Sequence, residues 1–488
     1  MNNKHKYGIW ALLTLCYWGA YTHAIPYIIP YHEEHHLFLY TEDYFKQVVH
    51  SEGIWSYLTN FLIQFFHYPL LGSAILSLML SSTYMSVRAI IIRLFGKEDL
   101  LSLSIIPSMI LFFHTMKVSH SLEPIIITVL SLNIANLLLW PLRCYQPLFP
   151  LLKNLHIRSQ KLRITLVVAP LFIYATYGSY HFIKAYDREE GILQKAYMHI
   201  KNNNWDKAEK YTNLYLSSGK PNHLISYFHH LTLFHKGQLL YRLFEHPQFL
   251  GVNSLYLPWN GTPHETEYGH FLYEGLGHIN EALHWESEAM VVWGENAPHL
   301  LKLIQYNILI QRPKVAQLFI DKLKQSLFYR KKALQLETIL ESGKVEGMEN
   351  TLEGITESPA RFTNFLNIGT ELEYLCKHNP NNQMASEYYM CYLLLSNNLT
   401  DFVRFLSHNQ HYQPASFPPA FEEALLLYQT EANKEEWAKV QWIISPETNS
   451  RFNRYNQLKQ NNQLKELQKE FRNTYWFYQD YITPYKKK

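Results

Sequence analysis

A glutamate between two histidines that lie one helical turn apart is the pattern in this sequence most typical of a metal-dependent enzyme. His32, Glu33 and His36 match H-E-x-x-H, in which two imidazoles on one helix face bind zinc and the carboxylate polarises the attacking water. The chain holds 25 histidines, so the pattern arises readily by chance, and no third ligand follows it. We therefore expect a solvated loop with neither metal nor cofactor. His32 and His36 are the ligands that a zinc site would require.

Acidic residues gather in the same segment. Many-spanning glycosyltransferases that use lipid-linked sugars keep an acidic catalytic residue in such a loop, where a carboxylate can act as general base on an acceptor hydroxyl. The candidates for that role are Glu33, Glu34, Glu42 and Asp43. A polar cap on a membrane loop explains the same residues, and such enzymes usually have more than five membrane spans.

A third group of His and Glu residues lies further along the chain. Its members are His264, Glu265, Glu267, His270, Glu274 and His278. Glu274 and His278 share a helix face, and a solvated helix face accounts for them as well as a site does. No Ser-His-Asp order, P-loop or glycine-rich dinucleotide motif occurs in a usable context. The sequence therefore favours binding over catalysis.

The composition narrows the classes of function. Lys and Arg number 44 and Asp and Glu 41, and the resulting net charge of +3 in 488 residues is too small to indicate a nucleic-acid partner. Charged residues make up 17% of the chain, against about 25% in an ordinary soluble domain. Because the deficit falls almost entirely in the first third, we expect that part to lie in a lipid bilayer.

Five apolar runs in residues 1–185 are long enough to cross about 30 Å of hydrocarbon. The predicted spans are 8–29, 68–92, 99–116, 124–142 and 164–184. Polar and aromatic residues dilute the first span, and a signal peptide cleaved after Ala24 is the alternative there.

Positive charge in the short loops orients these spans, because Lys and Arg are kept on the cytoplasmic side. Nine Lys and Arg lie before the first span or in the second and fourth connecting loops, against two in the other loops. The N-terminus is therefore predicted inside the cytoplasm and residues 186–488 outside it.

Residues 186–488 show helical periodicity, and their turns recur at a fixed spacing. Asn203 and Gly237 are 34 residues apart at two turns, and Ala282 and Ala316 are 34 apart on two later helices. This is the period of tetratricopeptide repeats, in which small residues lie where paired helices touch. The predicted fold class is all-α: a transmembrane bundle of about five spans followed by a tetratricopeptide-like α-solenoid.

Residues 246–269 interrupt the repeat with prolines, glycines and aromatic residues. We expect an irregular but ordered loop that either covers the solenoid as an apolar plug or presents a binding surface. The candidate binding residues are Leu255, Tyr256, Leu257 and Trp259. Two further possibilities stay open: Cys376 and Cys391 could pair, and the aromatic run 475–478 could return to the membrane surface.

Several stretches resemble an uncharacterised family of Gram-negative bacterial inner-membrane proteins. They are Leu37–Phe45 with its continuation to Gly72, Gly237–Gln248 with 257–259, and the segments 327–331, 384–388 and 417–424. The resemblance spans most of the chain and brings no known activity, so no catalytic residue follows from it. In that family the segment before Leu37 tends to be rich in Gln and Glu, which makes His32 and His36 peculiar to this chain.

The sequence thus predicts a multi-pass protein of the bacterial inner membrane with a cytoplasmic N-terminus and a periplasmic helical-repeat domain. Stacked helix pairs make extended concave surfaces, so we expect an interaction scaffold rather than an enzyme. The expected partners are the lipid bilayer and a protein or envelope polymer, with no nucleic acid. The glycosyltransferase-like enzyme is the alternative.

Overall fold

The computed structural model describes residues 3–95, 99, 101–139, 160–259, 262–342, 367–408, 417–432, 437 and 444–485. Within these ranges the regular structure is helical and contains no strand, which confirms the all-α prediction. The chain divides into two compact units. Unit 1 comprises Met1–Gly191, Trp293–Leu301 and Leu318–Glu337, and unit 2 comprises Ile192–Val292, Lys302–Gln317 and Thr338–Lys488.

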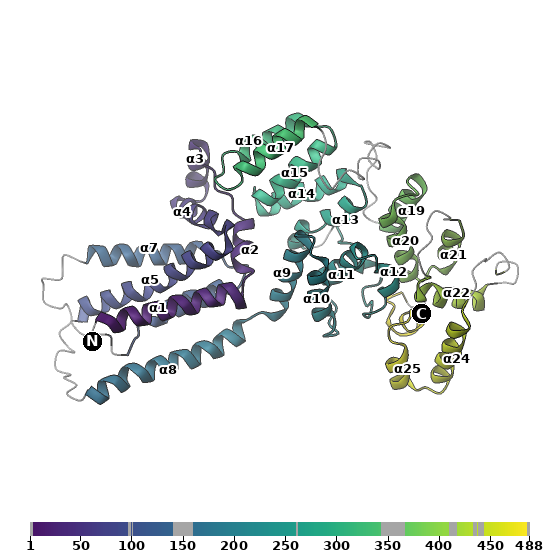
Figure 1. Ribbon diagram of the computed structural model, residues 1–488, viewed down its shortest axis with the longest axis horizontal. Helices are drawn as coiled ribbons and strands as arrows, with labels where there is room; N and C mark the ends of the chain where they lie inside the picture. Colours follow the sequence, from purple (N-terminus) through teal and green to yellow (C-terminus); the bar gives the residue numbers. More distant parts are fainter. Residues whose placement is uncertain are drawn as a thin grey trace. The chain divides into compact units, whose positions relative to one another are not determined.

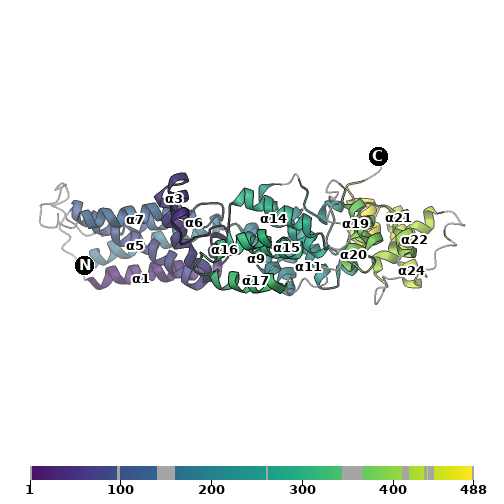
Figure 2. The same cartoon turned by 90° about the horizontal axis from the view of Figure 1, so that it is seen from above.

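The first part of the chain forms long helices joined by short ones. Their bounds are α1 Asn3–Gly19, η1 Ala20–Ala24, α2 Ile28–Glu34, α3 Glu42–Ser51, α4 Ile54–Ile63, η2 Gln64–His67, α5 Pro69–Phe95, α6 Ile105–Thr115, α7 Glu123–Leu138 and α8 Gln160–Ala185. In both views of unit 1, α1, α5 and α7 lie side by side (Figure 1, Figure 2).

Five of these helices alternate in direction along the chain: α1, α6 and α8 run one way, and α5 and α7 run the other. Side-chain contacts establish these directions. Between α1 and α5 they are Thr14 with Ser81 and Ile9 with Tyr84; between α1 with its continuation η1 and α6 they are Tyr17 with Ser108 and Tyr21 with Thr115. Between α5 and α7 they are Ser86 with Asn133 and Arg93 with Asn136; between α6 with the residues just before it and α8 they are Leu101 with Tyr174 and Phe112 with Phe182.

The lengths of the five helices differ. At about 1.5 Å per residue, the 27 residues of α5 and the 26 of α8 each extend about 40 Å, whereas the 11 residues of α6 cover only about 17 Å. Of the described residues, one helix, Pro69–Leu94, is both long and apolar enough to cross a membrane. Within the most apolar 18-residue stretch of this helix, 44% is buried, so much of the helix faces outward.

Close packing joins α2 to the start of α5. A Cβ atom at Gly72 would come within 2.7 Å of Ile29 and 2.9 Å of Phe66, so the absence of a side chain lets the two elements meet. This contact places the end of α2 and the 3-10 turn η2 next to each other, and both carry residues of the site described below.

The rest of the chain consists of shorter helices, most of them in unit 2. Their bounds are α9 Arg188–Lys201, α10 Trp205–Leu216, α11 His223–His235, α12 Leu239–Arg242, η5 Gly251–Ser254, η6 Pro263–Glu267, α13 His270–Gly275, α14 Ile279–Trp293, α15 Ala297–Leu309, α16 Pro313–Leu323, α17 Arg330–Ser342, α19 Ile368–His378, α20 Gln383–Leu395, α21 Leu399–His408, α22 Pro419–Glu431, α24 Pro446–Gln460, α25 Leu464–Phe471, α26 Tyr475–Phe477 and η7 Tyr478–Ile482.

The turns between paired helices share one backbone conformation. Each contains a residue with positive φ: Asn203, Gly237, Gly277, Gln311, Asn397 or Asn462, with φ from 53° to 77°. Glycine and asparagine tolerate this left-handed conformation, which ends a helix and reverses the chain. The predicted turns at Asn203 and Gly237 are therefore present, and the alanines at the predicted helix contacts, Ala282 and Ala316, are fully buried, as is Ala208 five residues after Asn203.

The C-terminal aromatic run corrects one prediction. Tyr475, Trp476, Phe477 and Tyr478 are all buried within unit 2, so they do not return to a membrane surface. Trp476 Nε1 donates to the carbonyl oxygen of Glu423 on α22 at 2.9 Å, which anchors this segment to the fold. The run is apolar because it completes a core with Tyr455, Leu467 and Phe471.

Candidate functional site

Glu33 is the centre of a polar cluster at the end of α2. Its carboxylate, 8% exposed, accepts a hydrogen bond of 2.5 Å from the Tyr329 hydroxyl and lies 3.3 Å from Nδ1 of His67. The His67 ring stacks on Phe328 with ring centroids 5.1 Å apart. Burial and the charge of Glu33 raise the pKa of Tyr329, so its hydroxyl remains a donor. The cluster joins segments of unit 1 that are 296 residues apart in the sequence.

The other predicted acidic candidates do not share this environment. Glu42 and Asp43 are exposed in the first turn of α3, where carboxylates favour the positive end of the helix dipole. Glu42 also forms an ion pair with Lys46 at 2.6 Å. Glu34 is half-buried, and its charge contributes to the raised pKa of Tyr329. Of the four carboxylates, only Glu33 is enclosed.

The rings of the two histidines of the H-E-x-x-H pattern lie near each other, at and just after the end of α2. Their ring centroids are 6.2 Å apart, and Nδ1 of His36 donates to the carbonyl oxygen of His32 at 2.6 Å. Burial holds the pKa of His32 well below its usual range, and the rings of His36 and His35 lower it further. Because His32 and Glu33 are buried, the predicted solvated loop is wrong for these residues.

Among the described residues, no group of three or more His, Cys, Asp or Glu side chains lies close enough together to hold a metal ion. The third predicted His and Glu cluster is divided between separate partners in unit 2: Glu265 with His223, His270 with Glu286, Glu274 with Lys302 and Tyr306, and His278 with Glu371. Glu274 and His278 do not share a helix face as predicted, because α13 ends at Gly275 and His278 lies in the turn before α14; both are half-buried.

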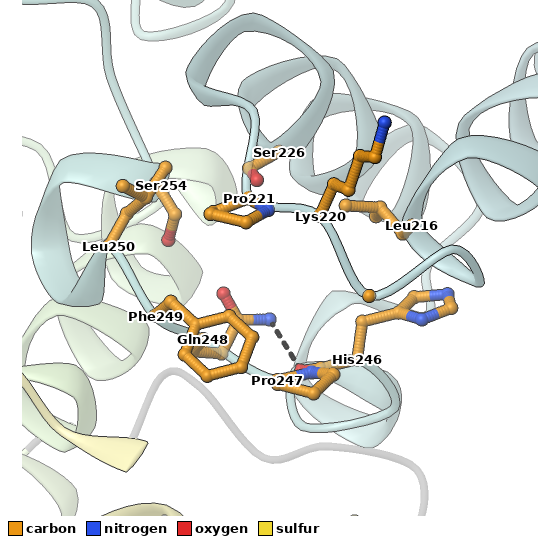
Figure 3. A pocket seen from close by; sticks show the side chains of 11 residues that line it. Leu216, Lys220, Pro221, Ser226, His246, Pro247, Gln248, Phe249, Leu250 and Ser254 are labelled. Atoms are coloured by element: carbon orange, nitrogen blue, oxygen red, sulfur yellow. Dashed lines mark hydrogen bonds between the residues drawn. The ribbon is translucent and has the colours of Figure 1, made fainter. Parts of the chain in front are cut away.

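The interruption at 246–269 packs into unit 2. Leu255 and Leu257 are buried, Tyr256 and Trp259 are half-buried, and Trp259 contacts His284 and Trp285 at ring distances of 4.2 and 5.0 Å. The start of this segment faces the turn after α10, where Pro247 and Phe249 lie opposite Leu216 and Pro221 (Figure 3).

The hollow between these two turns is too small for a ligand. Its volume of about 10 Å³ holds roughly one water molecule. Gln248 closes one side by donating through Nε2 to the carbonyl oxygens of Leu243 and His246, the second bond being the dashed line in Figure 3. Of the four predicted binding residues, Leu255 and Leu257 are buried and belong to the core of unit 2.

A larger pocket opens between α19, α20 and α21 of unit 2. Its volume is about 340 Å³, within the range of roughly 300–1,000 Å³ that ligand sites occupy. The lining residues are Glu373, Cys376, Lys377, Pro380, Tyr389, Asp401, Arg404, Phe405 and His408. Tyr389 and Phe405 meet edge to face, with ring centroids 4.9 Å apart, and form the apolar part of the pocket.

Charged residues of both signs border this pocket. Lys377 pairs with Glu373 at 2.6 Å on α19, and Arg404 pairs with Asp401 at 2.8 Å on α21. Both cationic side chains are about two-thirds exposed (67% and 66%), so a ligand can exchange with the existing partner at little cost. The pocket is suited to a peptide segment that carries positively and negatively charged side chains on either side of an apolar one.

The thiol in the pocket is unsuited to nucleophilic chemistry. Burial raises the pKa of Cys376 to about 12, although Ser386 accepts a weak hydrogen bond from its Sγ at 3.9 Å. Cys376 and Cys391 are both buried free thiols, so the open question of their pairing is answered in the negative.

Sequence reasoning missed His67, Tyr329 and the pocket residues. The ion pairs on α19 and α21 have ordinary helical spacings, and nothing local shows that they face one pocket. For Tyr329 one signal was present, since the segment 327–331 is among those that carry the family resemblance.

Comparison with known protein families gives one match that spans both units. The matching family is described as a family of unknown function (DUF6057), and its match covers residues 2–186 and 133–482. The chain belongs to this family. No curated protein and no solved structure matches the chain. Membership in DUF6057 bears out the predicted uncharacterised family and brings no activity with it.

Proposed function

We propose that this DUF6057 protein is a polytopic inner-membrane anchor that holds a periplasmic, tetratricopeptide-like scaffold for an envelope protein or polymer. The observation that carries the proposal is the pocket between α19 and α21, where paired charges surround Tyr389 and Phe405. A pocket of this kind can receive a side chain of a partner segment; burial raises the pKa of its Cys376 thiol, and no metal-ligand cluster occurs in the described residues.

The membrane part of the proposal is supported by the surface of unit 1. Exposed large apolar residues on a water-facing bundle would be unfavourable, whereas lipid accommodates them. They include Leu12 and Leu15 on α1, Leu70 and Leu78 on α5, Ile110 on α6, Leu137 and Leu138 on α7, and Phe172, Ile173 and Ile183 on α8. The alternating helix directions favour five passes and a C-terminal part on the side opposite the N-terminus.

The scaffold part of the proposal is supported by the helix pairs of unit 2. Their turns repeat the positive-φ residue, and the contact alanines are fully buried, as in stacked helical repeats. Repeats of this kind offer extended surfaces built from several helices, and the pocket draws on three consecutive helices.

The pocket can be tested by photo-crosslinking in living cells. A benzophenone amino acid in place of Arg404 should form a discrete adduct on illumination, and the same group in place of Arg454 should not. Arg454 is the matched control, because it is also an exposed arginine in an ion pair, with Glu470 on α25. Adding Lys377→Glu should reduce the adduct at least tenfold. Equal adducts at both positions, or none at Arg404, would overturn the assignment of the pocket.

A glycosyltransferase-like enzyme is the second candidate, and the enclosure of Glu33 is what favours it. Enclosed carboxylates next to a histidine are typical of acid-base catalysis. Here, however, the carboxylate already accepts from Tyr329, so a base at this position would have to lose that donor. The enzymatic proposal predicts that Glu33→Gln abolishes function in a folded protein, whereas Glu42→Gln leaves it intact. The scaffold proposal predicts that both variants function.

A further inference from the structure

We infer that helix α4 with the following turn η2 lies in the outer interface of the membrane, where its exposed face contacts lipid. This inference rests on the membrane anchor proposed above. It goes beyond that proposal because residues 54–67 belong to no predicted span. The partner is the lipid surface itself, at the level of the headgroups and the first acyl carbons.

A charge-free run extends well before the span of α5. No Asp, Glu, Lys or Arg occurs from Gly53 to Val87, although crossing the bilayer requires only about 20 apolar residues. The helix α5 begins at Pro69, so the residues before it form α4 and η2 as a separate apolar element. A soluble loop of this length would ordinarily carry charge.

The faces of α4 show what it contacts. Ser56, Thr59 and Ile63 are buried, and α4 packs against α3 and the neighbouring helix α7. The polar Asn60 is satisfied within the protein, because its Nδ2 donates to the Tyr44 hydroxyl at 3.1 Å. Its polar groups are thus directed into the protein and away from the exposed face.

The exposed face of α4 is apolar and continuous with the bundle. Ile54 and Phe61 are 43% and 36% exposed, and Tyr68 at the end of η2 is 57% exposed. Ile54 and Phe61 are seven residues apart, about two turns, and so lie on one side of α4, whereas Tyr68 follows the end of η2. Leu70 and Leu71 at the start of α5 are also exposed, so the apolar surface continues without a break onto the span.

Helix α3 provides the contrast. Its exposed residues include Glu42, Lys46 and Gln47, and the first two form an ion pair at 2.6 Å. A helix that lies in the interface combines an apolar face with aromatic side chains at the headgroup level. α4 and η2 combine Trp55, Tyr57, Phe61, Phe65 and Tyr68 with no Asp, Glu, Lys or Arg, whereas α3 exposes Phe45 beside charged side chains. We therefore place α3 in water and α4 in lipid.

Nitroxide labels in reconstituted protein test this placement. In a parent with Cys16→Ser and Cys144→Ser, single labels are introduced by Ile54→Cys and Phe61→Cys in nanodiscs of phosphatidylethanolamine and phosphatidylglycerol. Gln47→Cys is the water control and Phe172→Cys the lipid control. The parent without an added cysteine is the background control, because any nitroxide signal from it comes from the buried Cys376 and Cys391. Relaxation by oxygen, which concentrates in hydrocarbon, is compared with relaxation by a water-soluble nickel chelate.

The expected result is that labels at residues 54 and 61 collide with oxygen at least threefold more than the label at residue 47, and with nickel at least threefold less. Water-like values at both positions would overturn the inference. Low collision with both reagents would mean a protein-covered face, a second copy included, and would overturn it too. A water-like value at residue 172 would instead contradict the membrane anchor, so the two failures are distinguishable.

Discussion

At the scale of the residue, Glu33 shows that a motif in the sequence does not reveal the partners of its side chains. Within the H-E-x-x-H pattern, Nδ1 of His36 donates to the carbonyl oxygen of His32, and the Glu33 carboxylate accepts from Tyr329. The partners of Glu33 are 34 and 296 residues away, so the sequence around it contains no information about them. Candidate residues could be predicted from the sequence, but not their partners.

Removal of the Tyr329 hydroxyl should therefore destabilise unit 1. Tyr329→Phe leaves a buried carboxylate without its shortest donor, which costs roughly 1–3 kcal/mol. The melting temperature in detergent, followed by tryptophan fluorescence, should fall by several degrees. Tyr177→Phe is the matched control, since Tyr177 is 58% exposed, and its melting temperature should not change. Equal melting temperatures for Tyr329→Phe and wild type would show that the hydrogen bond contributes nothing.

At the scale of the element, sequence patterns predicted the turns correctly but did not predict which distant segments pack together. Asn203 and Gly237 could be predicted as turns because positive φ favours Asn and Gly. For the aromatic run 475–478 a return to the membrane surface was one possibility, whereas the run is buried in unit 2. Composition alone does not distinguish an aromatic anchor in lipid from one in a protein interior, because both remove the same area from water.

The attachment of that run to α22 should depend on pH. The Glu423 carboxylate accepts the backbone N–H of Tyr475 at 2.7 Å, and burial raises its pKa to about 7. A folded-state pKa above the unfolded value of 4.5 favours folding at low pH, and this contribution is lost as the pH rises through 7. The shift corresponds to roughly 3 kcal/mol at about 1.4 kcal/mol per pKa unit.

Glu423→Gln keeps an acceptor for Tyr475 and removes the charge. Its melting temperature should exceed that of wild type at pH 8 and equal it near pH 5. A loss of stability of the same size at both pH values would contradict the raised pKa.

The neighbouring Glu422 supplies a control of opposite sign. Burial acts to raise its pKa, but hydrogen bonds from Ser445 and Thr448 outweigh burial, and the pKa is lowered. Its contribution is present above pH 4.5 and is lost as the pH falls through the lowered value. Glu422→Gln should therefore destabilise the protein at pH 8 more than at pH 4. The two adjacent variants thus differ in the sign of their pH dependence.

At the scale of the whole molecule, the charge-poor first third and the all-helical class of the described residues could be predicted from the sequence. Apolar periodicity and turn residues act locally, which is why the helices of both parts follow the prediction. The pocket between α19 and α21 could not be predicted, because it depends on how three helices stack. The inclusion of Leu318–Glu337 in unit 1 could not be predicted either, because contacts between residues so far apart in the sequence leave no local sequence pattern.

The most direct test of the account is the side of the membrane on which the second part of the chain lies. Protease added to intact spheroplasts should digest an epitope tag placed after residue 220, in the exposed turn that follows α10, and leave a tag at the N-terminus untouched until the cells are lysed. Protection of the tag after residue 220 until lysis would contradict the account.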